Sequence, residues 1–325
     1  MLAPLLLLLS CLCVPPAHAQ TAPPAVRMRS EESIPFTFNQ GIAHIPGGWI
    51  LSGTNSPLPG TDVLVRTDEH FHVQTINQPA IPPLWRAQGY DHIGDIDVVG
   101  NTVYAPFEEP DYSKGHQVTA RYDVMTLAFR DAAVLPQHQN SFVAVDPSTM
   151  TAYSMDEFDG ASLLRYDVAH GWRPKPALQM SMLLHHTQGV GDGFIWICTS
   201  DDHNDVFRVS MATGHVDNIG TLGHAGGEGE GIDVTPLPSG YLHAMIIDPA
   251  LTNVWVEHFD LVTASLPATT APSTTRAPAV AGTGLANTGS RTPLAPLGLG
   301  AAALGAALWR LERHRYPRSA KSVRP

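Results

Sequence analysis

The hydrophobic positions of this chain recur in short alternating runs that end in a basic or aromatic pair. Four of these runs are alike and carry an arginine, namely Val63–Asp68, Thr119–Asp123, Leu163–Asp167 and Val206–Ser210. Their arginines stand at positions 66, 121, 165 and 208, so the intervals between them are 55, 44 and 43 residues. A fifth run without the arginine is Val254–His258. Alternation with a period of two residues predicts β-strands, and the near-constant interval indicates an internal repeat.

Further predicted strands precede each run and are separated by turns. The first strand of each unit begins with glycine or serine, at Gly41–Ala43, Gly94–Val98, Ser141–Val145, Gly189–Gly191 and Gly231–Val234. No stretch of this region keeps a helical period over three turns. Five units of about 45 residues, each with up to four short strands, predict an all-β fold, a five-bladed β-propeller over 24–262. A β-sandwich is the alternative, but it does not explain the interval.

The fifth unit lacks a predicted outer strand. We expect Ala25–Arg29 to supply it from the N-terminal side, so that the first and last blades are joined and the ring closes. The repeats resemble the YVTN and SMP-30-like propeller superfamilies in architecture and strand pattern. No motif that defines either superfamily is matched, so the resemblance implies a fold and not an activity.

The first 19 residues are predicted to be a secretory signal peptide. The apolar stretch Leu5–Val14 is followed by Ala17-His18-Ala19, and the small residues at 17 and 19 suit cleavage after Ala19. Leu8–Cys11 also resembles a lipoprotein cleavage box, so lipid attachment at Cys11 is the alternative. Both interpretations predict an exported chain.

The C-terminal end contains four segments in a fixed order. The Thr/Ala/Pro-rich stretch 263–284 cannot bury enough apolar surface to fold and is predicted to be an extended spacer. It is followed by Leu285-Ala286-Asn287-Thr288-Gly289, an apolar stretch at 293–309 and a basic tail at 310–325. This order resembles the LPxTG cell-wall sorting signal, with Ala286 in place of proline as in the LAxTG variant that one actinobacterial sortase class uses.

The resemblance to a sorting signal implies both partners and location. The apolar segment would be transmembrane with the basic tail in the cytoplasm. A sortase would cleave between Thr288 and Gly289 and join Thr288 to peptidoglycan. We therefore expect a secreted protein anchored at the outer face of a Gram-positive cell wall and membrane-inserted only as a precursor. A permanent single-span anchor is the alternative, although the apolar stretch is at the short end of the roughly 17–25 residues needed.

The amino-acid composition restricts which partners the chain can bind and whether it can form disulfides. The net charge of −11 argues against non-specific binding of nucleic acid, which requires cationic surface. Lysine is rare among the 19 basic residues, which hints at GC-rich coding and at an actinobacterium. Cys198 is the only cysteine of the predicted mature chain and follows the apolar run Phe194–Ile197. We predict a buried thiol and no internal disulfide.

Polar side chains gather where each innermost strand begins and each second strand ends, places that a propeller brings to one face. The predicted ligand-binding residues are Asp95, Asp97, Glu108, Glu109, Asp156, Glu157, His185, His186, Glu228 and Glu230. Like charges in one concave place repel unless a cation compensates, and carboxylate oxygens suit calcium. The predicted calcium ligands are Asp95, Glu108, Glu157 and Glu230. In the other interpretation these acids cap turns or face solvent.

The sequence favours binding over catalysis but leaves both open. The motifs HExxH and GxSxG and a CxxC pair do not occur, so no complete catalytic motif supports a zinc protease or a serine hydrolase. The first hypothesis is a wall-displayed propeller that binds an unidentified extracellular ligand. The second is a calcium-dependent hydrolase or lyase, lactonase-like as SMP-30-like propellers often are, with His92 or His186 transferring protons. The third is a propeller that serves only as a spacer.

Overall fold

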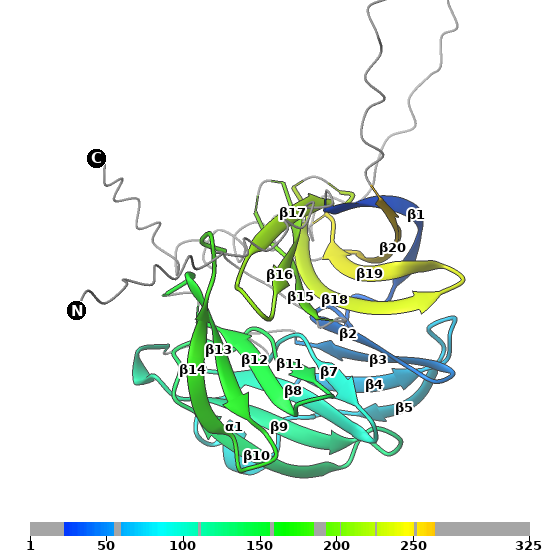
Figure 1. Cartoon of the computed structure of the whole chain (residues 1–325). Helices are drawn as coiled ribbons and strands as arrows, with labels where there is room; N and C mark the ends of the chain where they lie inside the picture. The colour runs from blue at the N-terminus through cyan, green and yellow to red at the C-terminus, as the bar shows by residue number, and fades with distance from the viewer. Residues whose placement is uncertain are drawn as a thin grey trace, which may run out of the picture.

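The computed structural model describes residues 23–54, 60–109, 112–156, 159–184, 193–201, 203–224, 226–249 and 252–263. Within these ranges, five small antiparallel sheets are arranged as the blades of a five-bladed β-propeller (Figure 1), which confirms the predicted fold. Outside the described residues lie the predicted signal peptide at 1–19, the spacer from residue 264, the sorting signal at 285–289, the apolar segment at 293–309 and the tail at 310–325.

The blades are numbered 1 to 5 along the chain. Blade 1 contains β2 (Gly41–Ile45), β3 (Gly48–Gly53), β4 (Val63–Thr67) and β5 (Val73–Asn77). Blade 2 contains β6 (His92–Ile93), β7 (Asp97–Val99), β8 (Thr102–Glu108), β9 (Gln117–Asp123) and β10 (Phe129–Leu135). Blade 3 contains β11 (Ala144–Asp146), β12 (Thr151–Met155), β13 (Ser162–Asp167) and β14 (Arg173–Gln179).

Blade 4 contains β15 (Phe194–Cys198), β16 (Asp205–Ser210) and β17 (Val216–Thr221), and blade 5 contains β18 (Glu228–Leu237), β19 (Gly240–Ile247), β20 (Val254–Thr263) and β1 (Pro24–Ile34). Two short helical segments, α1 (Pro83–Arg86) and η1 (Tyr112–Lys114), interrupt the loops. Around the ring, β18 contacts β2, β2 contacts β7, β7 contacts β11, and β15 contacts β18. Among the described residues, no helix has the length and apolar character to cross a membrane.

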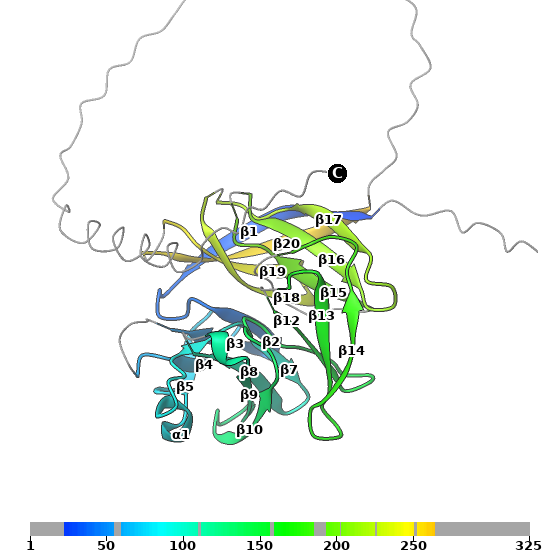
Figure 2. The same ribbon diagram turned by 90° about the vertical axis from the view of Figure 1, so that its left-hand side faces the viewer.

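The ring is closed by the N-terminal strand, as predicted, but over a longer stretch. β1 pairs with β20 in antiparallel register from Pro24 opposite Thr263 to Ile34 opposite Val254, with an irregularity between Met28 and Ser30. Figures 1 and 2 show β1 lying along β20 at the outer edge of blade 5. Two segments from opposite ends of the domain therefore complete one blade.

Within the described residues, the hydrophobic core consists of five clusters, one between each pair of neighbouring blades. Representative pairs are Ile50 and Phe107 for blades 1 and 2, Tyr104 and Tyr166 for blades 2 and 3, Met155 and Ile197 for blades 3 and 4, Val206 and Ala244 for blades 4 and 5, and Leu51 and Val256 for blades 5 and 1. Cys198 lies in the cluster of blades 4 and 5, and burial raises its pKa well above the ordinary value. Since each blade buries its faces only against its neighbours, stability depends on the closed ring.

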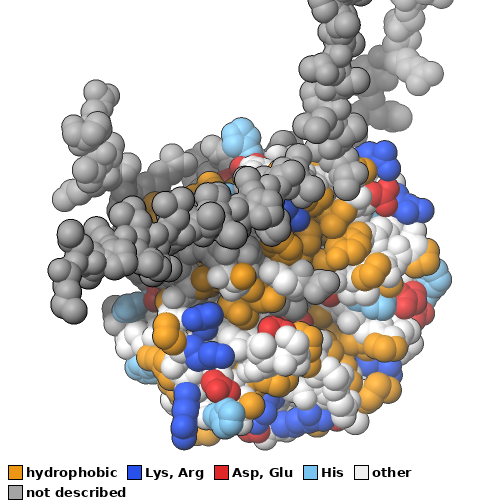
Figure 3. Space-filling model, viewed as in Figure 1, with side chains coloured by type: hydrophobic (Ala, Val, Ile, Leu, Met, Phe, Trp, Pro, Cys, Tyr) orange, Lys and Arg blue, Asp and Glu red, His pale blue; other side chains and the backbone are white. Residues whose placement is uncertain are grey.

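The repeated arginines take the same place in four blades. Arg66, Arg121, Arg165 and Arg208 lie on β4, β9, β13 and β16. Arg121 Nη2 donates to Asp131 on β10 at 2.6 Å, and Arg208 Nε donates to Asp217 on β17 at 2.9 Å. In blades 2 and 4 this arginine therefore reaches the outermost strand of its blade. Acidic, basic and hydrophobic side chains are interspersed on the face shown in Figure 3.

Candidate functional site

Asp95 lies at the centre of the ring, between β6 and β7, and is 1% exposed. Its Oδ1 accepts hydrogen bonds from the backbone N–H groups of Ile42 at 3.0 Å and Ile96 at 2.9 Å, and its Oδ2 accepts one from Ile232 at 3.3 Å. Ile42 and Ile232 belong to β2 and β18, which form edges of their sheets. An unpaired buried N–H group is costly. By accepting hydrogen bonds from N–H groups at the inner edges of blades 1, 2 and 5, this carboxyl group therefore holds the three blades together.

Gly41 permits this close approach. A Cβ atom at Gly41 would lie 2.7 Å from the Cα of Asp95, so no other residue fits without a shift of the backbone. Burial raises the pKa of Asp95 well above its ordinary value, although the three N–H donors act in the opposite direction. The glycine at position 41 and the buried carboxyl group of Asp95 together thus make the contact between blades 1 and 2 possible.

Asp97 and Asp233 make equivalent contacts from the repeated sequence Ile-Asp-Val in blades 2 and 5. Asp97 Oδ2 accepts from the N–H of Val145 in blade 3 at 2.6 Å, and Asp233 Oδ1 accepts from the N–H of His44 in blade 1 at 3.1 Å. Burial raises the pKa of both carboxyl groups, that of Asp97 to about 7. Each acid thereby connects its own innermost strand to that of the next blade.

A second group of polar residues lies between blades 2 and 3 and is called the channel mouth: Glu108, Glu109, Lys114, His138 and Asp156. Glu108 ends β8, and its Oε1 accepts from the N–H of Asn140 at 2.8 Å. Glu109 Oε2 accepts from Lys114 Nζ at 2.9 Å. The side chain of Glu109 is 2% exposed, whereas that of Lys114 is 41% exposed. A buried carboxylate therefore supports a solvent-facing ammonium group.

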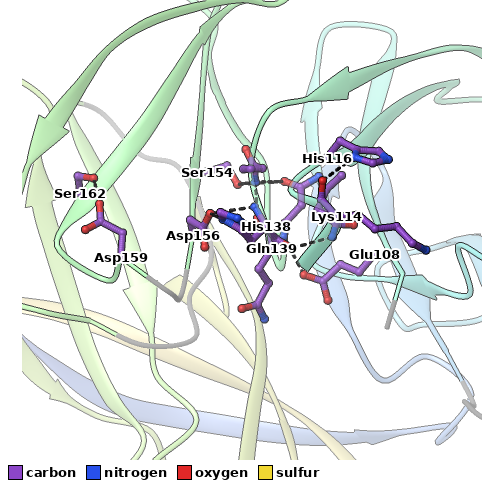
Figure 4. Close-up of polar contacts among 12 residues, drawn as sticks. Glu108, Lys114, His116, His138, Gln139, Ser154, Asp156, Asp159 and Ser162 are labelled. Atoms are coloured by element: carbon purple, nitrogen blue, oxygen red, sulfur yellow. Dashed lines mark hydrogen bonds and ion pairs between the residues drawn. The ribbon is translucent and has the colours of Figure 1, made fainter. Parts of the chain in front are cut away.

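The same arrangement recurs at His138. Its Nδ1 hydrogen-bonds to Asp156 Oδ2 at 2.9 Å, and its backbone N–H donates to the same oxygen at 2.8 Å. The side chain of Asp156 is 10% exposed and that of His138 is 50% exposed. Figure 4 shows His138 and Asp156 turned toward each other, with Glu108 and Lys114 coming from blade 2.

A buried network fixes the loop that carries His138. Gln137 Nε2 donates to Ser154 Oγ at 2.9 Å, and Tyr166 Oη donates to Gln137 Oε1 at 2.7 Å. Asn140 Nδ2 donates to the carbonyl oxygen of Val118 at 2.9 Å. Because residues on both sides of His138 are held by blades 2 and 3, its imidazole is a positioned group and not a chance surface residue.

Contacts of this kind repeat around the ring. The loop that leads into a blade is bonded to the residue that follows the second strand of the same blade, in three cases: Asn39 to Thr54 at 2.9 Å, His138 to Asp156 at 2.9 Å and His224 to Asp248 at 2.8 Å. In blade 2, His92 stands opposite Glu108 in the strand register. The repeat explains why polar residues concentrate at these places of the sequence.

The remaining predicted residues are distributed as follows. His92 lies on β6, and burial lowers its pKa to about 4, so its imidazole is neutral at neutral pH. Glu228 and Glu230 are half-buried at the start of β18 in blade 5, which is not a neighbour of blade 3. Glu157, His185 and His186 lie outside the described residues.

Two of the predicted calcium ligands already accept hydrogen bonds from the protein. Both oxygens of Asp95 already accept backbone hydrogen bonds, and Glu108 Oε1 accepts one from Asn140. Calcium takes six to eight oxygen ligands that converge on one point. Asp95 does not fit this role while it bonds the blades, so the calcium hypothesis rests on Glu108, Glu157 and Glu230.

Sequence reasoning missed Lys114 and His138, which are the exposed members of the channel mouth. His138 stands two residues before Asn140, in the segment that leads into blade 3, and a comparison with the loop at His224 would have indicated it. No sequence pattern indicated Lys114. This residue lies in the η1 segment, which has no strand alternation, and it contacts Glu109 from there.

No family model matches this chain, and no curated protein matches it either. Two similar solved structures are a luciferin-regenerating enzyme and the hydrazine synthase of Kuenenia stuttgartiensis. The first is 10% identical with a TM-score of 0.41, over 70% of this chain and 81% of that chain. The second is 11% identical with a TM-score of 0.40, over 66% of this chain and 57% of that chain. At this level the comparison transfers no chemistry, and the fold assignment rests on the sheet topology.

Proposed function

We propose that this chain is exported, attached by a sortase to the cell wall of a Gram-positive bacterium through Thr288, and displays a propeller that binds an extracellular ligand. The order of the sequence segments supports this. The last described strand, β20, ends at Thr263, where the Thr/Ala/Pro-rich spacer begins, and the Leu285–Gly289 signal follows that spacer. The spacer would hold the propeller away from the wall.

One observation carries the binding function: at the channel mouth, an exposed lysine and an exposed histidine rest on buried carboxylates. Lys114 and His138 are 41% and 50% exposed, whereas Glu109 and Asp156 beneath them are 2% and 10% exposed. Buried partners fix the exposed groups and reduce the entropy lost when a ligand is bound. Donors of this kind suit a ligand rich in acceptor oxygens, and we assign the class of hydroxylated or acidic glycans.

The binding function is tested with two variants of the channel mouth. Lys114→Ala and His138→Ala are each expected to weaken binding of an acidic glycan at least tenfold, since charged hydrogen bonds contribute about 1.5–3 kcal/mol. Lys175→Ala is the matched control, because Lys175 lies on β14 and donates to Thr151 on the neighbouring part of blade 3. Calorimetric titration with neutral and acidic glycans measures the effect. Equal affinities for the control and both mouth variants would refute this site.

A calcium-dependent hydrolase is the second candidate, and the His138–Asp156 pair favours it. A carboxylate on Nδ1 orients an imidazole so that Nε2 can act as a general base. Assays of lactones and esters, with calcium and with a chelator, distinguish the two functions. Turnover that depends on calcium and is lost in His138→Ala would replace the binding proposal with the hydrolase.

The display function is tested at the sorting signal. Thr288→Ala removes the threonine side chain that the sorting signal requires at the cleaved bond, so the protein is expected to disappear from the wall fraction that muramidase releases. Thr283→Ala changes the same residue type in the preceding spacer and should leave wall attachment intact. Immunoblots of wall, membrane and medium in an actinobacterial host with an LAxTG-type sortase give the result. Wall attachment of the Thr288 variant would exclude sorting through this signal.

A further inference from the structure

A cluster of three potential metal ligands lies in blade 5, away from the channel mouth. It consists of Glu31 on β1, His224 in the loop before β18 and Glu257 on β20, and one ligand atom of each lies within 4.8 Å of the others. His224 Nε2 is 3.1 Å from Glu31 Oε2 and 3.9 Å from Glu257 Oε1. A zinc ion bound at about 2.0–2.2 Å keeps its tetrahedral ligands roughly 3.4 Å apart. The three atoms are therefore close to the spacing that such an ion requires.

Glu257 has a buried oxygen that is directed into this cluster. The side chain is 0% exposed, and its Oε2 accepts from the N–H of Gly223 at 2.8 Å. Its Oε1 has no hydrogen-bond partner within the described part of the chain. A Cβ atom at Gly223 would lie 2.2 Å from this oxygen, so glycine keeps the space beside it open. A buried carboxylate oxygen without a donor is costly unless a cation reaches it.

The strand register brings two negative charges together at the same place. Glu31 and Glu257 stand directly opposite each other in the β1–β20 pair. Like charges in this position destabilise a sheet. A divalent cation between the two carboxylates would convert the repulsion into an attraction that holds β1 on β20.

His224 is oriented as a metal-binding histidine would be. Its Nδ1 hydrogen-bonds to Asp248 Oδ2 at 2.8 Å, and the ring of Trp255 stacks on it with centroids 5.1 Å apart and planes 20° apart. These two contacts set the plane of the imidazole and direct Nε2 toward Glu31 and Glu257. Metal-bound histidines commonly use their other nitrogen in this way, as donor to a carboxylate.

We propose that Glu31, His224 and Glu257 bind a divalent transition-metal ion of the zinc type, which joins the N-terminal strand to blade 5. One imidazole nitrogen and two carboxylate oxygens suit zinc, whereas calcium takes six to eight oxygen ligands. Glu31 is 41% exposed, so water completes the coordination from the solvent side. Asp248 is a positioning residue that acts through His224.

The test uses the full chain in detergent, stripped of metal with a chelator and titrated calorimetrically with Zn²⁺. The unmodified chain is expected to bind one zinc ion at this site and to melt at a higher temperature with it. Glu257→Gln should weaken that binding at least tenfold. Glu32→Gln is the matched control, because the neighbouring side chain on β1 is directed to the other face. The difference between these variants also separates this site from the other histidines of the chain.

Two further variants keep the outcome decisive. Asp248→Asn is expected to weaken zinc binding by 10–100-fold, as is typical for the carboxylate behind a metal-bound histidine. If Glu257→Gln does not fold, Glu31→Gln at the exposed ligand gives the same comparison. Equal zinc affinity in Glu257→Gln or Glu31→Gln and in the control overturns the proposal. The absence of zinc binding to the unmodified chain does so as well, and would mean that a protonated His224 alone bridges the two glutamates.

Discussion

Replacing Asp95 with alanine is expected to lower the free energy of unfolding by about 3–5 kcal/mol and the melting temperature by roughly 10 °C. The reason is that this carboxyl group accepts hydrogen bonds from three backbone N–H groups, those of Ile42, Ile96 and Ile232. Without it, these groups are buried without a partner, and each costs about 1–3 kcal/mol. Blades 1, 2 and 5 lose a common contact at the centre of the ring. Thermal and denaturant unfolding of the purified protein measure the effect.

Two other variants show whether the hydrogen bonds cause the loss. Asp95→Asn keeps an acceptor for Ile42 and Ile96 but turns an amide N–H toward the N–H of Ile232, so its loss should lie between the unmodified protein and Asp95→Ala. Asp131→Asn breaks the ion pair with Arg121, in which the Asp131 side chain is 50% exposed, and should cost less than about 1 kcal/mol. A loss for Asp95→Ala no larger than that for Asp131→Asn would contradict the assigned role.

The fold was predictable because one strand of each of four blades has the same residue pattern, including an arginine. Arg66, Arg121, Arg165 and Arg208 occupy the same place in four blades, so their spacing along the chain gives the size of the repeat. The closing strand was predictable for a related reason, since the fifth unit is one strand short. Only its length was underestimated, because the exposed and charged half of β1 around Glu31 has no hydrophobic alternation.

The roles of the acids were not predictable from the same patterns. Alternation places Asp95 and Asp97 on one side of a strand, but it does not show that this side faces the edges of β2, β11 and β18. The N–H groups at those edges require hydrogen-bond acceptors, and this requirement appears only when the blades are assembled. The juxtaposition of Glu31 and Glu257 likewise depends on the register of β1 on β20, which pairs residues at least 220 positions apart.

Three kinds of acid can now be distinguished by their partners. Asp95, Asp97 and Asp233 accept hydrogen bonds from backbone N–H groups at the centre of the ring. Glu109 and Asp156 support the exposed side chains of Lys114 and His138 at the channel mouth. Glu257 retains a buried oxygen without a hydrogen bond in the described residues. Only the last two kinds are suited to a ligand, and they lie in different blades, which is why the binding of a glycan and the binding of a metal are tested separately.

Removing the closing strand is expected to have the largest effect on the domain. A chain that begins at Pro35 lacks β1, which is bonded to β20 over 11 residues and contacts β17. It also loses Ile34 from the cluster between blades 5 and 1, and Val26 from the packing between blades 4 and 5. With about 0.5–1.5 kcal/mol for each backbone hydrogen bond of this pairing and about 1.5–3 kcal/mol for Ile34, the loss is on the order of 10 kcal/mol. This is comparable to the whole stability of a typical domain, so no cooperative melting transition is expected.

The matched control begins at Pro24 and keeps all of β1, and it should melt like the longer chain. A synthetic peptide of residues 24–34 should restore a cooperative transition to the shortened chain by strand addition. The same peptide with Val26 and Ile34 replaced by serine should not restore it, because the exposed ion pairs of Arg27 and Arg29 with Asp260 contribute less than about 1 kcal/mol each. If the chain that begins at Pro35 melts within a few degrees of the control, closure by β1 is not what stabilises the ring. The five interfaces between blades would then have to hold the ring together without it.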